Sequence, residues 1–315
     1  MMQIYALSNK KIQQIEQSEL QEKKFDKVWI DIKSITKEES VLLQEACNIH
    51  PLIVEDFLHA DSRIKVEEFS DYLFLVFYTF RKKETIQILE LDFVLNSKFL
   101  ITHHTEDIDK YEKIKNNSQK LALLLEKGTE YLFHQLIDNE VDAMQPILEA
   151  ISDNIDTLEE RILSSADQTN IASDILSMKR EVSKMRRIMM AQREKFSFIA
   201  KNNLPFISKK ALPYFRDVYD HIIVASDIIE DLKENINSAY EIYMTNLSNK
   251  MNEVMKILGI FATISLPLTV ISGIFGTNFF NLPLAHNEYG FWVMILAMFL
   301  MSTSMIYFFK RRGWF

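Results

Sequence analysis

The sequence contains few of the residues that disulfide frameworks, thiolate metal clusters and phosphate-binding loops require. Its 315 residues include one cysteine, Cys47, and six glycines, which excludes a disulfide framework and a cysteine-ligated metal cluster. It has no Gly-rich phosphate loop and no evident pair of nucleophile and base, so an enzyme is disfavoured. The net charge of -8 gives a nucleic-acid partner no electrostatic support. The N-terminus, MMQIYALSNKK, has neither the apolar run of a signal peptide nor the arginines of a transit peptide.

Two uncharged apolar runs near the C-terminus predict two membrane spans. Residues 257–275 and 291–309 are each long enough, at about 1.5 Å per residue, to cross a bilayer core of roughly 30 Å. Three basic residues, 310–312, follow the second run, and the loop between the runs has no Lys or Arg. Because positive charge marks the cytoplasmic side, we expect both termini in the cytoplasm. Two helices cannot enclose a channel, so a pore would require an oligomer.

The rest of the chain predicts a cytoplasmic α/β domain followed by long helices. Runs such as YLFLVFYTF and IQILELDFVLN alternate with turns before residue 105, and two helical patterns interleave at residues 36–48 and 51–58. An acidic helix at 141–163 and a basic helix at 172–200 are interpreted as solvated faces of a long hairpin. The expected division is 1–125 for the α/β domain, 126–207 for the hairpin, 208–255 for a stalk helix, 256–276 for the first span, 277–290 for an external loop, 291–309 for the second span and 310–315 for a basic tail.

Small residues repeat along one face of the first span. Steps of three and four residues keep them in one line, which predicts helices that supercoil around each other. Two interpretations stay open: close helix packing through small residues, or the lining of a narrow axial pore. This small-residue stripe consists of Asn252, Met255, Gly259, Ala262, Leu266, Thr269, Gly273 and Gly276.

The same helical phase, extended backwards along the stalk helix, becomes strongly acidic. In a closed oligomer each carboxylate would form a ring of like charges, which is costly unless a cation fills it. A solvated acidic face is the simpler interpretation, and a cation-attracting funnel is the one we favour. This acidic stripe consists of Asp217, Asp220, Asp227, Asp231, Glu234 and Glu241.

Several segments resemble the CorA family of divalent-cation channels. They are PYFRDVYDH, the run SNKMNEVMKILGIFATISLPLTVISGIFGTNF, the ending FFKRRGW and, in the N-terminal domain, HPLIVEDFLHADSRIKVEEFSDYLFLV. The resemblance implies a funnel-shaped homopentamer in a prokaryotic inner membrane whose first span lines the pore. It also implies transport of Mg²⁺, often with Co²⁺ or Ni²⁺, driven by the membrane potential.

The resemblance also assigns roles to residues. Gly276, Thr277 and Asn278 occupy the family's Gly-Met-Asn signature, and Asn278 would place a ring of amide oxygens at the outer mouth, where neutral oxygens attract Mg²⁺ through its water shell. Met255 and Leu258 would form a hydrophobic constriction. The other pore-lining matches are Asn252, Leu266, Thr269 and Gly273, and Gly259 and Ala262 lie on the same stripe.

A regulatory metal site is implied as well. Asp217 matches a carboxylate that holds Mg²⁺ between subunits and keeps the pore closed when the cell is replete. Glu84 is a candidate partner for it, and Asp142 lies near a second regulatory carboxylate.

Two departures from the family pattern keep alternatives in view. Thr277 stands where the signature has methionine, and Glu288 is the only acid in the external loop. A transporter of zinc or another transition metal on the same scaffold, as in the ZntB branch, is therefore an alternative. A non-conducting, membrane-anchored coiled-coil sensor or tether is a second alternative, from another class of protein.

Overall fold

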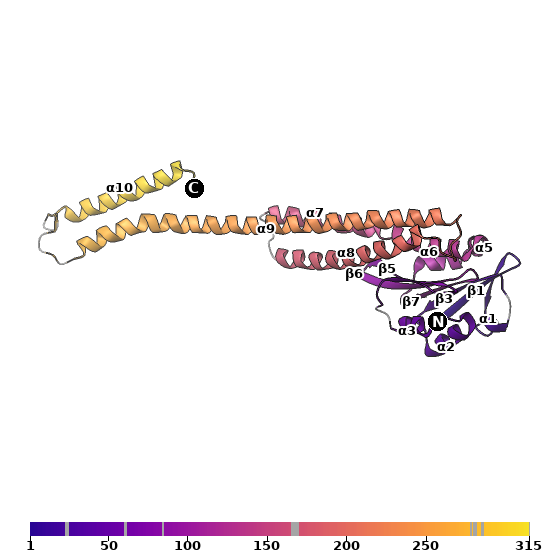
Figure 1. The fold of residues 1–315 in the computed structure, drawn as a ribbon. Helices are drawn as coiled ribbons and strands as arrows, with labels where there is room; N and C mark the ends of the chain where they lie inside the picture. Colours follow the sequence, from indigo (N-terminus) through magenta and orange to yellow (C-terminus); the bar gives the residue numbers. More distant parts are fainter. Residues whose placement is uncertain are drawn as a thin grey trace. The chain divides into compact units, whose positions relative to one another are not determined.

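The computed structural model describes residues 1–22, 25–59, 62–83, 85–164, 170–277, 279, 282–284 and 287–314. The chain divides into two compact units, Met1–Ala239 and Tyr240–Phe315. The first unit is built on a mixed β-sheet and the second on two helices (Figure 1).

A seven-stranded sheet forms the base of the first unit. Its strand order is β2-β1-β3-β7-β6-β5-β4; β3 and β7 pair in parallel, and all other neighbours are antiparallel. The central strands are buried on both faces, as expected for strands covered on both sides. The strands are β1 (Met2–Ser8), β2 (Lys11–Ile15), β3 (Lys27–Lys33), β4 (Lys65–Glu68), β5 (Leu73–Lys82), β6 (Ile86–Leu95) and β7 (Phe99–His104).

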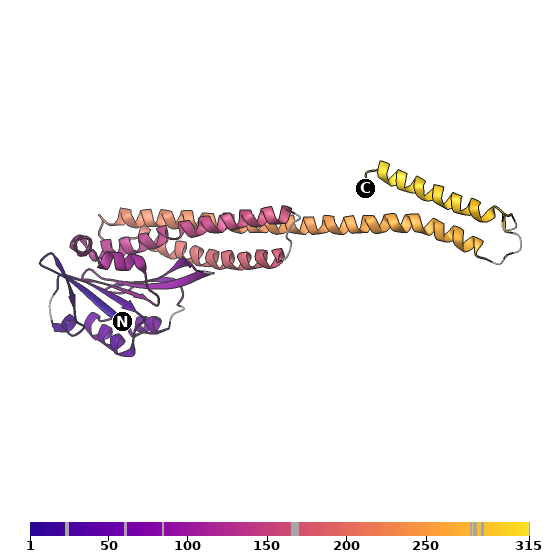
Figure 2. The same ribbon diagram turned by 180° about the vertical axis from the view of Figure 1, so that it is seen from behind.

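Helices cover both faces of this sheet. Figures 1 and 2 show α2 and α3 on one face and α6, α7 and α8 on the other. The helices of the first unit are α1 (Glu19–Glu22), α2 (Lys37–Cys47), α3 (Pro51–Leu58), α4 (Asp109–Lys115), α5 (Ser118–Lys127), α6 (Thr129–Asp142), α7 (Gln145–Leu163), α8 (Ile171–Lys201) and the first part of α9 (Leu212–Phe275).

Local signals in the sequence set the ends of the two short helices α2 and α3. Thr36 caps α2 by accepting a hydrogen bond from the backbone N–H of Glu39, whose side chain bonds back to the Thr36 N–H. Asn48 ends α2 in the left-handed conformation, with φ 51°, which asparagine tolerates. Pro51 then opens α3, where its missing N–H costs nothing. Both helices thus begin and end where the sequence predicts.

Aromatic rings join the other face of the sheet to α6 and α9. Phe93 of β6 lies 5.3 Å from Phe133 of α6, and Phe133 lies 5.5 Å from Phe215 of α9, measured between ring centroids. All three side chains are buried. The apolar line on α9 then continues through Ile222, Ala225, Ile229, Leu232, Ile236 and Ala239, all of them buried.

The long helix α9 is a single element of 64 residues, and Pro267 lies inside it. The other helix of the second unit is α10 (Gly290–Arg311). Both are long and apolar enough to cross a membrane, and their most apolar stretches are almost wholly exposed. The predicted class is confirmed: an α/β N-terminal domain, a long helix and a C-terminal helix, with two candidate membrane spans.

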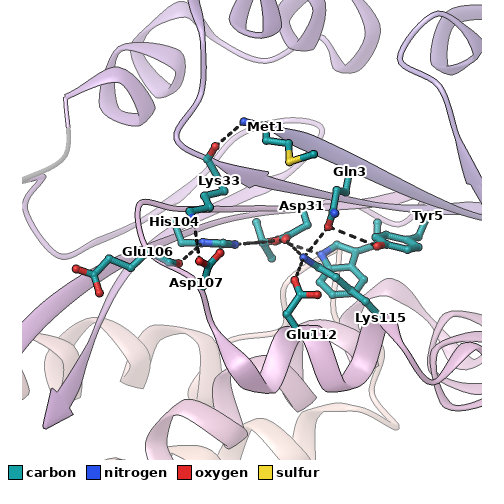
Figure 3. A network of polar contacts seen from close by, with 12 residues as sticks. Met1, Gln3, Tyr5, Asp31, Lys33, His104, Glu106, Asp107, Glu112 and Lys115 are labelled. Carbon is teal, nitrogen blue, oxygen red and sulfur yellow. Dashed lines mark hydrogen bonds and ion pairs between the residues drawn. The ribbon is translucent and has the colours of Figure 1, made fainter. Parts of the chain in front are cut away.

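A buried polar network fastens α4 to the parallel strands β3 and β7 (Figure 3). The Lys115 ammonium lies 2.6 Å from an Asp31 carboxylate oxygen, and both side chains are almost fully buried. The same carboxylate accepts hydrogen bonds from the Thr102 hydroxyl and from Nε2 of His104, at 3.2 Å. Trp29 in turn donates to Thr102 at 3.0 Å. Every member therefore satisfies another, as buried polar groups require.

The network shifts the pKa of both charged partners toward their ionised forms. Burial raises the pKa of Asp31, but the hydrogen bond and charge of His104 together with the Lys115 ammonium bring it below its usual range. Burial lowers the pKa of Lys115, and Asp31 and Glu112 raise it above its usual value. Since the folded-state pKa of Asp31 is depressed, its contribution to stability is present above the ordinary carboxyl pKa. That contribution is lost as the pH falls through the folded-state value.

Replacing Lys115 with methionine is expected to lower the free energy of unfolding by about 3 kcal/mol, because it leaves the Asp31 carboxylate buried without its cation. Urea denaturation of the full-length protein, followed by Trp29 fluorescence with Trp292 and Trp314 replaced by phenylalanine, measures this. Lys33→Met is the control, since among the described residues the Lys33 side chain forms only an exposed ion pair with Asp107, and its loss should leave the midpoint unchanged. Equal effects of the two substitutions would contradict a special role for the buried pair.

Candidate metal centre and pore face

Two acidic residues of α6 and two polar residues of α9 meet on facing sides of these helices. Asp138 and Asp142 are four residues apart on α6, and so are Asp217 and His221 on α9, so each pair shares one helix face. One ligand atom each from Asp138, Asp217 and His221 lie within 4.8 Å of one another. Asp142 adds a carboxylate oxygen 3.7 Å from Nδ1 of His221. We call these four residues the α6–α9 cluster.

The α6–α9 cluster is electrostatically crowded. Burial raises the pKa of Asp138, and the nearby Asp142 and Asp217 raise it further, while His134 and His221 oppose this. Burial likewise lowers the pKa of His134, against the pull of Asp138 and Asp217. Carboxylates that repel each other at partly buried positions are relieved by a bound cation.

The residues present fit a divalent cation. Two or three carboxylate oxygens suit Mg²⁺, whereas the imidazole nitrogen of His221 suits Co²⁺, Ni²⁺ or Zn²⁺. Asp217 and His221 are exposed and Asp138 is half-buried, which leaves ligand positions for water or for a group from another chain. Such an open donor set is typical of an exchangeable ion rather than of a closed structural site.

The structure brings together two of the three predicted regulatory residues. Asp217 and Asp142 both belong to the α6–α9 cluster, and the third, Glu84, lies outside the described residues. On the acidic stripe, Asp227 is paired with Arg193 of α8 at 3.1 Å. The others, Asp220, Asp231, Glu234 and Glu241, are exposed and form no ion pair within the described part of the chain.

Sequence reasoning missed three residues of this region: Asp138, His221 and His134. A signal for the first two was available, because each lies four residues from a residue that was singled out. His134 lies a further turn along α6, with its ring 5.3 Å from Tyr214 and 5.8 Å from Phe215. Its Nε2 atom is buried and has no hydrogen-bond partner among the described residues.

In the second unit, α9 and α10 each present one line of partly buried residues. On α9, Ile260 is buried, and Lys256, Ile264, Pro267 and Ile271 are half-buried. On α10 the corresponding line is Met294, Met298, Ser302, Met305 and Phe309. The Lys256 ammonium also donates to the carbonyl of Gly313 at 3.4 Å. These two lines mark the faces along which the helices pack.

The small-residue stripe lies on a different face of α9, about 140° around the helix from the α10 side. Met255, Leu258 and Leu266 are 66%, 62% and 67% exposed, and Asn252, Ala262 and Thr269 are exposed as well. A Cβ added at Gly259 or Gly273 would meet no atom within 4 Å. No described contact within the chain therefore requires glycine at these positions, although glycine inside a helix costs about 1 kcal/mol relative to alanine.

The predicted signature falls at the end of α9. Gly276 donates its N–H to the carbonyl of Ser272 at 2.9 Å, and the Thr277 hydroxyl donates to the carbonyl of Ile274 at 2.7 Å. The Thr277 hydroxyl is thus used by its own helix. Asn278 lies outside the described residues.

The structure thus combines an α/β unit, two helices long and apolar enough to span a membrane, and a group of acidic and imidazole side chains that could hold a metal ion. The family model described as CorA-like Mg²⁺ transporter protein matches residues 26–311. The chain belongs to this family, and the predicted resemblance is confirmed.

Particular relatives agree with this assignment. The chain is 33% identical over 291 residues to the cobalt/magnesium transport protein CorA of Thermotoga maritima, covering 91% of this chain and 83% of the relative. Its fold matches the complete CorA magnesium transporter of Methanocaldococcus jannaschii with a TM-score of 0.88 at 23% identity, covering 100% and 99% of the two chains. The ZntB cytoplasmic domain of Vibrio parahaemolyticus matches with a TM-score of 0.64 at 12% identity, covering 78% and 98%. These structural likenesses show the fold and do not rank ions.

Removing the imidazole of the α6–α9 cluster is expected to weaken Co²⁺ binding more than Mg²⁺ binding. His221→Ala should lower Co²⁺ affinity by roughly tenfold or more and change Mg²⁺ affinity little, because imidazole is a preferred ligand only of the transition metal. Calorimetric titration of the full-length protein in detergent with each ion measures this. Asp231→Asn, which is exposed on the same helix, is the control, and equal losses for both ions would contradict ligation by His221.

Proposed function

We propose that this protein is a homopentameric channel that passes Mg²⁺, with Co²⁺ or Ni²⁺, through a membrane into the cytoplasm. Five copies of α9 surround the pore, and the small-residue stripe faces the shared axis. The observation that carries the proposal is the uncovered state of this stripe. Its residues lie off the face that packs against α10, and Gly259 and Gly273 contact nothing that would exclude a larger side chain.

The proposal gives each part of the stripe a role. Met255 and Leu258 form a hydrophobic constriction that closes the pore by excluding water, and small or hydroxyl residues further along leave room for a hydrated ion. Thr269 already bonds its hydroxyl to the carbonyl of Ser265 at 2.9 Å, so it presents a satisfied, weakly polar wall. Asn278 supplies amide oxygens at the outer mouth. Both termini lie in the cytoplasm of a prokaryotic cell.

The α6–α9 cluster serves as the internal sensor in this proposal. When cytoplasmic Mg²⁺ is high, the ion binds Asp217 together with Asp138 and a group from the neighbouring subunit, for which Glu84 is the candidate. Because the ligands come from α9 and from a second element, binding favours the arrangement in which the two stay together. Loss of the ion leaves the carboxylates to repel one another, and the pore opens.

A transporter of zinc or another transition metal is the second candidate. The imidazole of His221 in the α6–α9 cluster favours it, since Mg²⁺ sites seldom use nitrogen ligands. The relative from T. maritima is described as handling both cobalt and magnesium, which agrees with mixed oxygen and nitrogen ligands. A non-conducting tether would show no ion flux at all, so one assay separates the three candidates.

Substituting the proposed filter residue is expected to abolish transport. Asn278→Ala removes the amide oxygens that attract the hydrated ion, so uptake of Mg²⁺ and Co²⁺ into proteoliposomes should fall to background. The assay compares Mg²⁺, Co²⁺, Ni²⁺ and Zn²⁺ and uses Thr303→Ala as a control, because that hydroxyl bonds only the carbonyl of Phe299 in its own helix. Full transport by Asn278→Ala would refute the filter assignment.

Reversing a charge in the sensor is expected to relieve inhibition by internal Mg²⁺. Asp217→Lys places an ammonium where the cation would bind, so uptake should persist at internal Mg²⁺ concentrations that silence the unaltered protein. Proteoliposomes loaded with graded Mg²⁺ provide the measurement. Glu126→Lys, at an exposed position of α5, changes the net charge equally and should keep normal inhibition. Unchanged sensitivity in Asp217→Lys would show that the sensor does not lie at this site.

A further inference from the structure

The basic helix α8 divides its charges between two faces. Arg186 and Arg193 point toward α9 and pair with Glu230 and Asp227. On the opposite side, Arg180, Lys184 and Arg187 are exposed and form no ion pair within the described residues. These three, in steps of four and three, form the basic ladder. Three unpaired cations in a line stand out in a protein with a net charge of -8.

The neighbouring helix α7 has a matching line of acids on its exposed face. Glu149, Asp153, Asp156 and Glu160 follow one another in steps of four, three and four, and all four are exposed. They lie across α7 from its buried line, Ile151, Ile155, Leu158 and Ile162. We call the four acids the acidic ladder. Like charges on one helix face repel each other, and neither ladder is neutralised within the described chain.

The two ladders lie at the same levels along the α7–α8 hairpin. The ion pair between Arg161 of α7 and Asp174 of α8, at 2.9 Å, fixes how the antiparallel helices are aligned. Because the helices are antiparallel, each step from Arg161 toward the start of α7 matches one step from Asp174 toward the end of α8. By this count three acids lie level with the three cations, to within about two residues or 3 Å. The level pairs are Asp156 with Arg180, Asp153 with Lys184, and Glu149 with Arg187.

The two ladders cannot meet within one chain, because each lies on the outer side of its own helix. Figures 1 and 2 show α7 and α8 running alongside the first part of α9. In the proposed pentamer the symmetry axis follows α9, so rotation moves each copy around the axis without changing its height. Residues that are level within one chain are then level between neighbouring chains.

We propose that the basic ladder of α8 docks on the acidic ladder of α7 in a second copy of this chain. The contact is head-to-tail, so it repeats around a closed ring and leaves no ladder unpartnered. It rests on the oligomer of the proposed function and adds the surface that sets the register between cytoplasmic units. An anionic membrane explains the contact less well, because lipid phosphates have no fixed levels and the net charge of the protein opposes adsorption.

Disulfide trapping in the full-length protein tests the contact. Cys47→Ala removes the native thiol, whose pKa burial raises to about 12. Chains with both Asp153→Cys and Lys184→Cys should form a series of disulfide-linked oligomers on mild oxidation. The control, Glu160→Cys with Arg187→Cys, places the two cysteines on the same two faces but about twelve residues out of level, so its chains should stay free of disulfide links. Equal trapping in both, or none in either while the protein is oligomeric, would overturn the proposal.

A charge swap checks that the ladders attract each other. In the trapping background, Asp156→Arg should slow linkage by about fivefold, as expected for a lost exposed pair, and Arg180→Asp in the same chain should restore it. Added salt should slow linkage in all variants. If Lys184→Glu leaves trapping at neighbouring positions unchanged but abolishes binding to phosphatidylglycerol vesicles, the basic ladder is a lipid site and the proposal fails.

Ion flux separates this proposal from the proposed function. If proteoliposomes take up Mg²⁺ but the level and out-of-level cysteine pairs are linked equally, the channel proposal stands and the proposed contact between the ladders is wrong. If the protein is monomeric and passes no ion, the channel proposal is wrong, and so is the contact, which depends on the ring.

Discussion

The packing of Phe215 against Phe133, backed by Phe93, fixes how α9 is rotated on the α/β unit. Everything polar on the first part of α9 follows from this contact, since each residue along a helix turns the side chain by about 100°. Two and six residues after Phe215, Asp217 and His221 are turned toward α6. Without the aromatic contact these carboxylates and the imidazole would be separated and solvated, and their ligand atoms would not lie close enough together to hold one ion.

Two groups of buried or half-buried acids in the same unit behave in opposite ways, and the difference separates structure from function. Asp31 has its ammonium, its hydroxyl and its imidazole already in place, so the charge is compensated and the pKa is lowered. Asp138 is held beside other carboxylates without a cation, and its pKa is raised. The first arrangement stabilises the fold, whereas the second stores repulsion that a divalent ion would relieve.

The sequence predicted the fold where local signals and packing agree. The strand patterns of β5 and β6, the helical pattern over residues 36–48 and the contiguous stalk helix and first span of α9 each correspond to an observed element. The edge strands β2 and β4 were not predicted, because they are short and carry charges such as Lys65 and Glu67. Those charges protect a sheet edge and at the same time hide the alternation that indicates a strand.

Prediction of the site was limited by a different physical cause. A single acid on a helix is usually solvated, so the spacing of four residues between Asp138 and Asp142 was a weak signal until α9 was placed beside it. The pairing of Asp227 with Arg193 was missed for the same reason: the basic residues of α8 were treated as one solvated face. In the structure, Arg186 and Arg193 face α9, whereas Arg180 and Arg187 face away from it and are exposed. The number of charges along a sequence cannot make that distinction, because the partner of each charge depends on which helices pack together in the fold.

In the proposed channel, the donor atoms for ion selection and for ion sensing would differ in kind. In the proposed channel, the Gly-Thr-Asn signature would offer hydroxyl and amide oxygens, ligands that hold an ion through its water shell. The α6–α9 cluster offers carboxylate and imidazole, which can replace water directly and bind transition metals more strongly than Mg²⁺. If the chain forms the proposed channel, an ion admitted weakly at one end would be bound tightly at the other. The proposed sensor would then respond to Co²⁺ or Ni²⁺ at lower concentrations than to Mg²⁺ and would close the pore to the transition metal first.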